Sequence, residues 1–384
     1  MKSNYRYIVK AFMAMAVIAG TTSCDDFLDR EPMSSISPET YYSTAAQLEA
    51  NLNDEYPNVL PSFGQWTYGI FGEDKGTDNQ IEVNANDRYT QDRWKVPHSE
   101  SDNWKFERIY RINFFLSEAL PKFGEDMSGS QNTISGSVAT IKHYIGEMYF
   151  LRAYEYFKKL QLFGDFPIID QPLADEMEAL REASKRFPRN EVARFIISDL
   201  DKAYAYMSDV DMATTRINKD AAMLVKSRVA LFEATWLQNF KGTAFVPGGE
   251  GWPGASLHNN YQYPSGNIDN EVKYFLEQAV EASKLVADKY KGSLTENTGV
   301  LQQSADDPSN PYFDMFAQED LSDVKEVLLW RQYARGLSTH NINAAAGRGN
   351  YRIGLTRGFV QNFLMKDGTP VYAHGSYADG DGYY

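Results

Sequence analysis

The chain has 384 residues, with 38 basic and 52 acidic side chains and a formal net charge of −14. Such an acidic surface repels phosphate backbones and anionic headgroups, so nucleic-acid binding and adsorption to a membrane by charge are both disfavoured. Neutral ligands are compatible with this surface. The length allows one or two domains with a large core. Aromatic residues make up 14% of the chain, which directs the search for binding residues to them.

Residues 1–23 have the pattern of a secretory signal. A segment with three basic residues and no acidic one precedes an apolar run at residues 11–20, and small residues follow it. The run is shorter than the roughly 20 residues that span a bilayer, so we expect a cleaved signal rather than a transmembrane helix. Cys24, the only cysteine, closes this leader and has no partner for an internal disulfide.

The residues before Cys24 resemble the lipobox of bacterial lipoproteins, in which the thiol is acylated and the preceding bond is cut. They are small throughout, although Thr21 stands where a leucine or similar residue is usual. The resemblance implies that Cys24 carries a lipid anchor and that residues 24–40 form a lipidated tether. Several acyl chains make such an anchor effectively permanent. The alternative is a stray thiol near the terminus.

The first predicted helix begins after Thr44. Gln47 lies three residues later, as in a capping box, and the helical pattern ends near Pro57. Residues 61–103 are rich in glycine, asparagine, aspartate and aromatic residues without a helical period. We expect long loops there, with room for short strands.

Helical periodicity dominates residues 104–290, because apolar residues recur at steps of three and four. The long run VATIKHYIGEMYFLRAYEYFKKLQLFG should end at Gly164, and a loop at residues 240–268 should separate the last two helices. Small residues packed against aromatic ones are typical of tetratricopeptide arrays, although the spacing is too uneven for a regular repeat. We therefore predict a mostly α fold of irregular tetratricopeptide-like helix pairs. The helices are expected to start near Trp104, in the long run, at Asn190, at Asn218, and at Asp269 or Asn270.

The C-terminal part, residues 291–384, is predicted to be rich in loops. The segment EVLLWRQY, residues 326–333, gives the one clear strand signal. The later segment FVQNFLMKDGTPVY indicates a short helix followed by a turn.

Common catalytic, cofactor-binding and metal-binding motifs are absent from the sequence. There is no HExxH, CxxC, Walker loop or GxSxG, and the five histidines are scattered. His143, inside the long helical run, is predicted to be a packing or solvent-facing residue. We expect no metal, no cofactor and no enzyme activity. A glycoside hydrolase stays as a remote alternative, since it needs only two suitably placed carboxylates.

Aromatic side chains in loops are the candidate ligand contacts. Flat aromatic faces stack on the axial C–H faces of sugar rings, while asparagine and aspartate bind the hydroxyls. The alternative is that these aromatics fasten the loops to the core, which is the interpretation we prefer for Trp104 and Trp236 because of their helical spacing. The candidates are Trp66, Tyr68, Trp94, Trp252, Tyr261 and Tyr263, with Asp78 and Asn79 as polar partners.

The segment GEMYFLRAYEYFKKLQLFGDFPII, residues 146–169, closely resembles a motif of the SusD/RagB family of Bacteroidetes outer-membrane lipoproteins. CDDFLDREP, YRIN, INKDAAMLVKSRVALFEA and LTRGFVQNFLMKDGTPVY agree with the same family, so the resemblance extends over the mature chain. The residues that match the central motif are Gly146, Glu147, Leu151, Arg152, Ala153, Tyr154, Tyr156, Phe157, Gly164, Asp165 and Pro167.

The resemblance implies a single SusD-like domain at residues 41–384, with a loop-rich binding face and a few short strands. It implies a lipoprotein on the outer membrane, facing the cell exterior, that captures oligosaccharide and delivers it to a SusC-like TonB-dependent transporter. Family members usually continue past the DG-P stretch, so we expect residues 291–384 to be an incomplete C-terminal part. The alternative is a surface scaffold that uses its helices for protein–protein assembly without affinity for glycans.

Overall fold

The computed structural model describes residues 41–64, 72–82, 103–124, 126–208, 212–301, 304, 306–334, 336, 339–340 and 353–373. Four residues singled out from the sequence lie outside this part of the chain. They are Cys24, Trp66, Tyr68 and Trp94. The proposed signal, anchor and N-terminal loop contacts therefore stay predictions.

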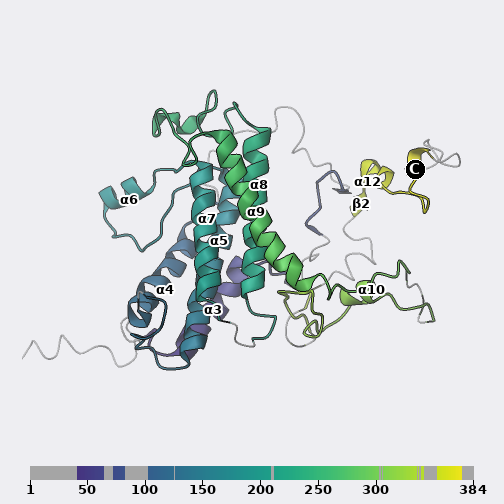
Figure 1. Ribbon diagram of the computed structural model, residues 1–384, viewed down its shortest axis with the longest axis horizontal. Coiled ribbons are helices and arrows are strands. Elements are labelled where there is room, and N and C mark those ends of the chain that lie inside the picture. Colours follow the sequence, from purple (N-terminus) through teal and green to yellow (C-terminus); the bar gives the residue numbers. More distant parts are fainter. Residues whose placement is uncertain are drawn as a thin grey trace, which may run out of the picture.

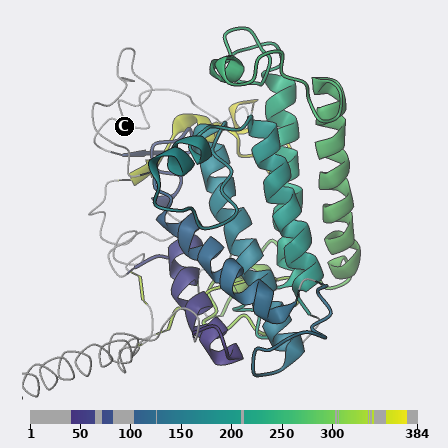
Figure 2. The ribbon, with the colours of Figure 1, turned by 90° about the vertical axis from the view of Figure 1, so that its left-hand side faces the viewer.

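Long helices packed side by side form the body of the molecule, so the predicted mostly α fold is confirmed (Figure 1). α5 contacts α3, α4 and α7, and α8 lies between α7 and α9. Figure 2 shows α9 at one edge of this body. The helices are α3 (Ala45–Val59), α4 (Glu107–Phe123), α5 (Val138–Phe163), α7 (Arg189–Tyr206), α8 (Lys219–Asn239) and α9 (Ile268–Tyr290).

Local capping residues set several helix starts. Thr44 and Gln47 form the predicted capping box of α3, and the Asn218 side chain accepts from the backbone N–H of Ala221 at the start of α8. Asn267 caps α9, so the helix begins at Ile268, one or two residues before the predicted start at Asp269 or Asn270. Aspartate and asparagine at several neighbouring positions compete for the cap, which makes that boundary ambiguous in sequence.

Buried ion pairs tie these helices together. Arg152 of α5 pairs with Asp199 of α7, and Arg189 of α7 pairs with Glu233 of α8. His143 is 1% exposed and its Nε2 lies 3.0 Å from the Ile217 carbonyl oxygen, so its predicted packing role is confirmed. Charges buried in this way cost free energy unless they are paired, so loss of one partner would destabilise the contact between the two helices.

Shorter elements complete the described fold. β1 (Gln80–Glu82) and β2 (Ile353–Leu355) pair antiparallel, which joins the loop after α3 to the C-terminal part. The predicted short helix and turn near residue 360 are confirmed, because α12 (Arg357–Gln361) is followed by a turn in which the Gly368 N–H donates to the Met365 carbonyl at 2.9 Å. α6, on which no residue is buried, was not predicted. The remaining short helices are α6 (Met177–Ala183), η3 (Pro253–Ser256), α10 (Pro311–Met315), α12 (Arg357–Gln361) and η4 (Val371–Ala373).

The strand predicted at residues 326–333 is wrong, since this segment is not part of a sheet. Its backbone instead makes single hydrogen bonds to the turn before α8. The Trp330 N–H donates to the Thr214 carbonyl at 3.1 Å, and the Asn218 side chain donates to the Leu328 carbonyl at 2.6 Å. The apolar run that resembled a strand packs on the helices, since Leu328 and Leu329 rest against the core.

Among the helices of the described residues, none combines the length and apolar character that crossing a membrane requires.

Candidate functional site

The loop between α8 and α9, residues 240–267, covers the end of the body where α5 and α8 end and α7 and α9 begin (Figure 1). Gly249 allows the loop to fold tightly on itself, because a Cβ atom there would lie 1.9 Å from the Thr243 carbonyl oxygen. This loop carries the predicted contacts Trp252, Tyr261 and Tyr263.

Trp252 fastens the loop to the end of α5. Its side chain is 5% exposed, and its Nε1–H donates to Asp165 Oδ2 at 2.7 Å. The other carboxylate oxygen, Oδ1, accepts from the backbone N–H of Arg189 at 2.9 Å. Burial raises the pKa of Asp165, and the two hydrogen bonds oppose that shift. Gly254 packs so closely on the indole that a Cβ atom would lie 2.2 Å from it, so little of the ring is left for a ligand.

Tyr261 and Tyr263 hold the loop at two further points. The Tyr261 hydroxyl donates to Asn190 Oδ1 at 3.0 Å, and the Tyr263 hydroxyl donates to the Pro247 carbonyl at 2.7 Å. Burial raises the pKa of both hydroxyls, which keeps them protonated as donors. The structure thus brings Trp252, Tyr261 and Tyr263 together, with neighbouring ring centroids 5.6 and 5.2 Å apart. Their contact with a ligand stays a prediction.

Glu271, at the start of α9, anchors the base of the loop. Its carboxylate accepts from Arg194 Nε at 2.7 Å, from Asn190 Nδ2 at 3.0 Å and from the Ser265 N–H at 3.2 Å. Burial alone would raise the pKa of Glu271, but these hydrogen bonds and the Arg194 charge outweigh it, so the pKa is lowered from 4.5.

Acid should weaken this anchor, because the pKa of Glu271 is lowered in the folded protein. A carboxyl with a lower pKa in the folded state adds stability that is complete above its unfolded value of 4.5 and is lost as the pH falls through the folded pKa. We expect the Glu271→Gln variant to be less stable than the wild type at pH 7 and to lose less stability between about pH 5 and 3. Urea unfolding at a series of pH values measures both effects.

The matched control is Glu277, which is exposed on the same helix and lies 3.8 Å from Lys273. Glu277→Gln should change the free energy of unfolding by less than about 1 kcal/mol. A wild-type and a Glu271→Gln profile of equal slope in acid would contradict the assignment of Glu271 as the anchor.

A pocket of about 480 Å³ opens between this loop and the helix ends. Its exposed aromatic surface is Phe245, which is 62% exposed, together with the half-buried Trp236. Trp236 Nε1–H donates to the Phe245 carbonyl at 3.0 Å, and the Arg189 guanidinium lies 4.1 Å from the Trp236 ring. The lining residues are Gln161, Leu162, Phe163, Gly164, Asp165, Arg186, Arg189, Trp236, Ala244, Phe245, Trp252, Pro253, Gly254 and Leu257.

Phe245 was not among the predicted contacts, although it meets the criterion by which Trp252 was chosen, an aromatic side chain in a loop. Phe245 stands in the glycine- and proline-rich stretch KGTAFVPGGEGW of the same loop. Trp236 was assigned to the core by its helical spacing, and it does pack there through Phe232 and Phe240. Its position in the last turn of α8 also places it beside the pocket, so the same side chain packs on the core and lines the pocket.

The predicted polar partners Asp78 and Asn79 belong to another part of the molecule. They precede β1, and their backbone carbonyls accept hydrogen bonds from the side chain and the N–H of Thr356. Asp78 is exposed. Neither residue lines the pocket beside Trp252.

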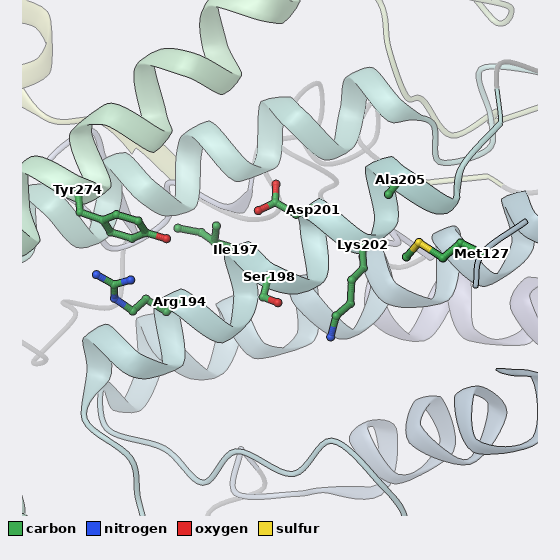
Figure 3. A pocket seen from close by; sticks show the side chains of 8 residues that line it. All are labelled: Met127, Arg194, Ile197, Ser198, Asp201, Lys202, Ala205 and Tyr274. Carbon is green, nitrogen blue, oxygen red and sulfur yellow. The ribbon is translucent and has the colours of Figure 1, made fainter. Parts of the chain in front are cut away.

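Two other pockets fit a hydroxyl-rich ligand less well. Figure 3 shows a shallow pocket of about 360 Å³ at which the Arg194 guanidinium lies against the Tyr274 ring. Its charged side chains are paired within the protein, Arg194 with Glu271 and Lys202 with Asp199. A larger cavity of about 770 Å³ lies beneath residues 326–332, and its walls are mainly apolar. Among these three pockets, the one beneath the 240–267 loop is distinguished by a largely exposed aromatic side chain, Phe245, in its lining.

Within the described part of the chain, no three histidine, cysteine, aspartate or glutamate side chains come together as they would to hold a metal ion.

Residues 26–231 match the SusD-like family model described as starch-binding, associating with outer membrane. SusD-like protein P2 of Formosa agariphila is 25% identical over 253 residues, which are 63% of this chain and 46% of the relative. SusD-like protein P25 of the same organism is 25% identical over 233 residues, 56% of this chain and 41% of the relative. The chain therefore spans less than half the length of these curated relatives.

A solved structure shares the fold. It is a SusD-like carbohydrate binding protein from Bacteroides fragilis, with a TM-score of 0.53 and 15% sequence identity, and the match covers 90% of this chain and 57% of that structure. At this identity the likeness concerns the fold alone.

Proposed function

The chain belongs to the SusD-like family, and from this premise we propose that it binds oligosaccharide at the cell surface and delivers it to a SusC-like TonB-dependent transporter. The observation that carries the proposal is the family match over residues 26–231, which includes the pocket residues at the end of α5 and the start of α7, whereas Trp236 and the loop residues of the pocket follow it in the chain. In this proposal the mature chain is held at the outer membrane by lipid on Cys24.

The pocket has the properties that binding of a sugar requires. Its volume of about 480 Å³ lies in the range of small-molecule sites. Phe245 and Trp236 offer flat apolar faces for the C–H surface of a sugar ring, and Gln161 and Arg186 offer hydrogen-bond donors at its rim. Trp252 supports the site from beneath by holding Asp165 and the loop in place.

Substitution of Phe245 by alanine should weaken oligosaccharide binding by about tenfold or more, because it removes the most exposed ring of the pocket. Isothermal titration calorimetry against starch-derived malto-oligosaccharides and a panel of other oligosaccharides measures the effect. Phe316, which is 73% exposed and does not line the pocket, provides the control. Phe316→Ala should bind as the wild type does.

Other results would favour the alternatives. A wild-type chain that binds none of the oligosaccharides would support a surface scaffold for protein–protein assembly. Release of reducing sugar would support a hydrolase. Binding that Phe245→Ala leaves unchanged would move the glycan site to another part of the chain, such as the segments with Trp66 and Trp94 that the sequence predicts to be loops.

A further inference from the structure

Three charged side chains line the pocket beneath the 240–267 loop, and two of them are engaged within the protein. Arg189 is 3% exposed, and its Nε and Nη2 donate to both carboxylate oxygens of Glu233 at 2.9–3.1 Å. Asp165 accepts one hydrogen bond on each oxygen, from the N–H of Arg189 and from Trp252 Nε1. The third charged side chain is Arg186.

Arg186 is positioned by its neighbours without being neutralised by them. Its guanidinium lies 4.6 Å from the centre of the Trp104 ring, and that ring is itself held edge-on by Phe163 and Phe166. The Arg186 carbonyl accepts a hydrogen bond from Nε2 of His258, a residue of the 240–267 loop, at 2.8 Å. Across the described residues, its guanidinium has neither an ion-pair partner nor a hydrogen-bond acceptor. The N–H groups of Arg186 are therefore free to bind a ligand.

We propose that Arg186 recognises an anionic group, a carboxylate or a sulfate ester, on the saccharide bound in this pocket. The inference rests on the proposed function and narrows its ligand to acidic glycans. The planar guanidinium binds such groups through two parallel N–H···O bonds, which a neutral hydroxyl cannot match. Stacking on Trp104 reduces the rotamer freedom that a free arginine would lose on binding, because its orientation is already set.

The acidic character of the whole chain does not oppose this assignment. A net charge of −14 repels an anion at long range, but salt screens charges beyond about 8 Å at physiological ionic strength. Contact with Arg186 therefore dominates inside the pocket. The one acidic side chain in the lining is Asp165, whose two carboxylate oxygens each accept a hydrogen bond within the protein.

The test compares saccharides that differ only in charge. Oligogalacturonate is paired with its methyl ester, and a sulfated galactan oligosaccharide with its desulfated form, each titrated into the full chain by calorimetry. We expect the wild type to bind at least one charged form about tenfold more tightly than its neutral partner, and to lose this preference as sodium chloride is raised. Which pair shows the preference distinguishes a carboxylate from a sulfate.

The variants assign the preference to one side chain. Arg186→Gln should abolish it, whereas Arg186→Lys should keep part of it, since lysine retains the charge but not the two-pronged geometry. Arg181→Gln, at an exposed position on α6 outside the pocket, should keep all of it. Thermal unfolding of each variant shows whether the fold is intact, and Arg186→Lys covers the case in which Arg186→Gln fails to fold.

The outcomes separate the two proposals. Equal binding of charged and neutral forms by the wild type, or a preference that survives in Arg186→Gln, would overturn the role of Arg186 while leaving oligosaccharide binding in place. If the wild type binds no saccharide of either kind, both the role of Arg186 and the proposed function fail.

Discussion

Replacement of Arg152 by methionine should lower the free energy of unfolding by about 3–5 kcal/mol, because it removes both hydrogen bonds from Arg152 to the buried carboxylate of Asp199 and leaves only the exposed Lys202 near that charge. Arg152 is 3% exposed and Asp199 is fully buried. Nε and Nη2 of Arg152 donate to the two carboxylate oxygens at 2.6 and 2.8 Å. Nη1 donates to Asn113 Oδ1 and to the Asp170 carbonyl, both at 2.9 Å. One side chain thus joins α5 to α4, to α7 and to the segment that follows α5.

A loss of this size would be a large part of the total free energy of unfolding, since domains are commonly stable by only about 5–15 kcal/mol. Urea unfolding followed by circular dichroism measures it. Lys202 provides the control, because its Nζ lies 3.7 Å from Asp199 Oδ1 but its side chain is exposed. Lys202→Met should cost less than about 1 kcal/mol.

A double variant tests whether the cost comes from the unpaired charge. Arg152→Met combined with Asp199→Leu should recover part of the stability that Arg152→Met alone loses, since it removes the stranded carboxylate. An Arg152→Met variant within about 1 kcal/mol of the wild type would show that the pair does not hold the three helices together.

Sequence reasoning predicted the long helices well because their signals are local. Thr44 and Gln47 act on each other across three residues, and the start of α8 needs only Asn218 and the N–H of Ala221. The stop of α5 is equally local. Gly164 takes a positive φ of 69°, which glycine adopts without steric cost.

The errors arose where the structure depends on distant partners. The run at residues 326–333 has the composition of a strand, but no strand of the described residues pairs with it. Its apolar side chains Leu328 and Leu329 pack on the helical core, and the Leu328 carbonyl accepts from Asn218, 110 residues earlier in the chain. α6 was not predicted from the sequence for a different reason. It buries none of its residues, so it lacks the apolar periodicity by which a helix is recognised.

The loop that borders the pocket was predicted from the sequence, but which of its side chains are exposed was not. The composition of residues 240–268 indicated a loop, and residues of that loop do line the pocket. Trp252 is turned inward because Asp165, 87 residues earlier, accepts its N–H. Phe245 has no polar atom on its side chain to be held in this way and stays exposed. The sequence does not single out Arg186, because it does not reveal which charges are paired. In the structure, Asp165 and Arg189 have hydrogen-bond partners within the protein.

Gly146, at the centre of the fold, is another residue whose role depends on contacts that the sequence does not reveal. The sequence places it inside the long helix, where glycine is unfavourable by about 1 kcal/mol relative to alanine. The structure supplies the reason, since α5 and α7 approach each other closely here. A Cβ atom on Gly146 would lie 2.8 Å from the Met207 backbone nitrogen and 2.9 Å from the Ala203 carbonyl oxygen.

Gly146→Val should therefore destabilise the protein by about 3 kcal/mol in urea unfolding, because α7 must move away from α5. The matched control is Gly358→Val in α12, where nothing lies within 4 Å of the added Cβ atom, and its stability should stay within about 0.5 kcal/mol of the wild type. The side chain of Met207 also approaches the site, with Cγ at 2.7 Å. If the backbone contacts cause the loss, Met207→Ala will not rescue Gly146→Val. Rescue would instead place the strain in a flexible side chain and would show that the two helices can accommodate a residue larger than glycine.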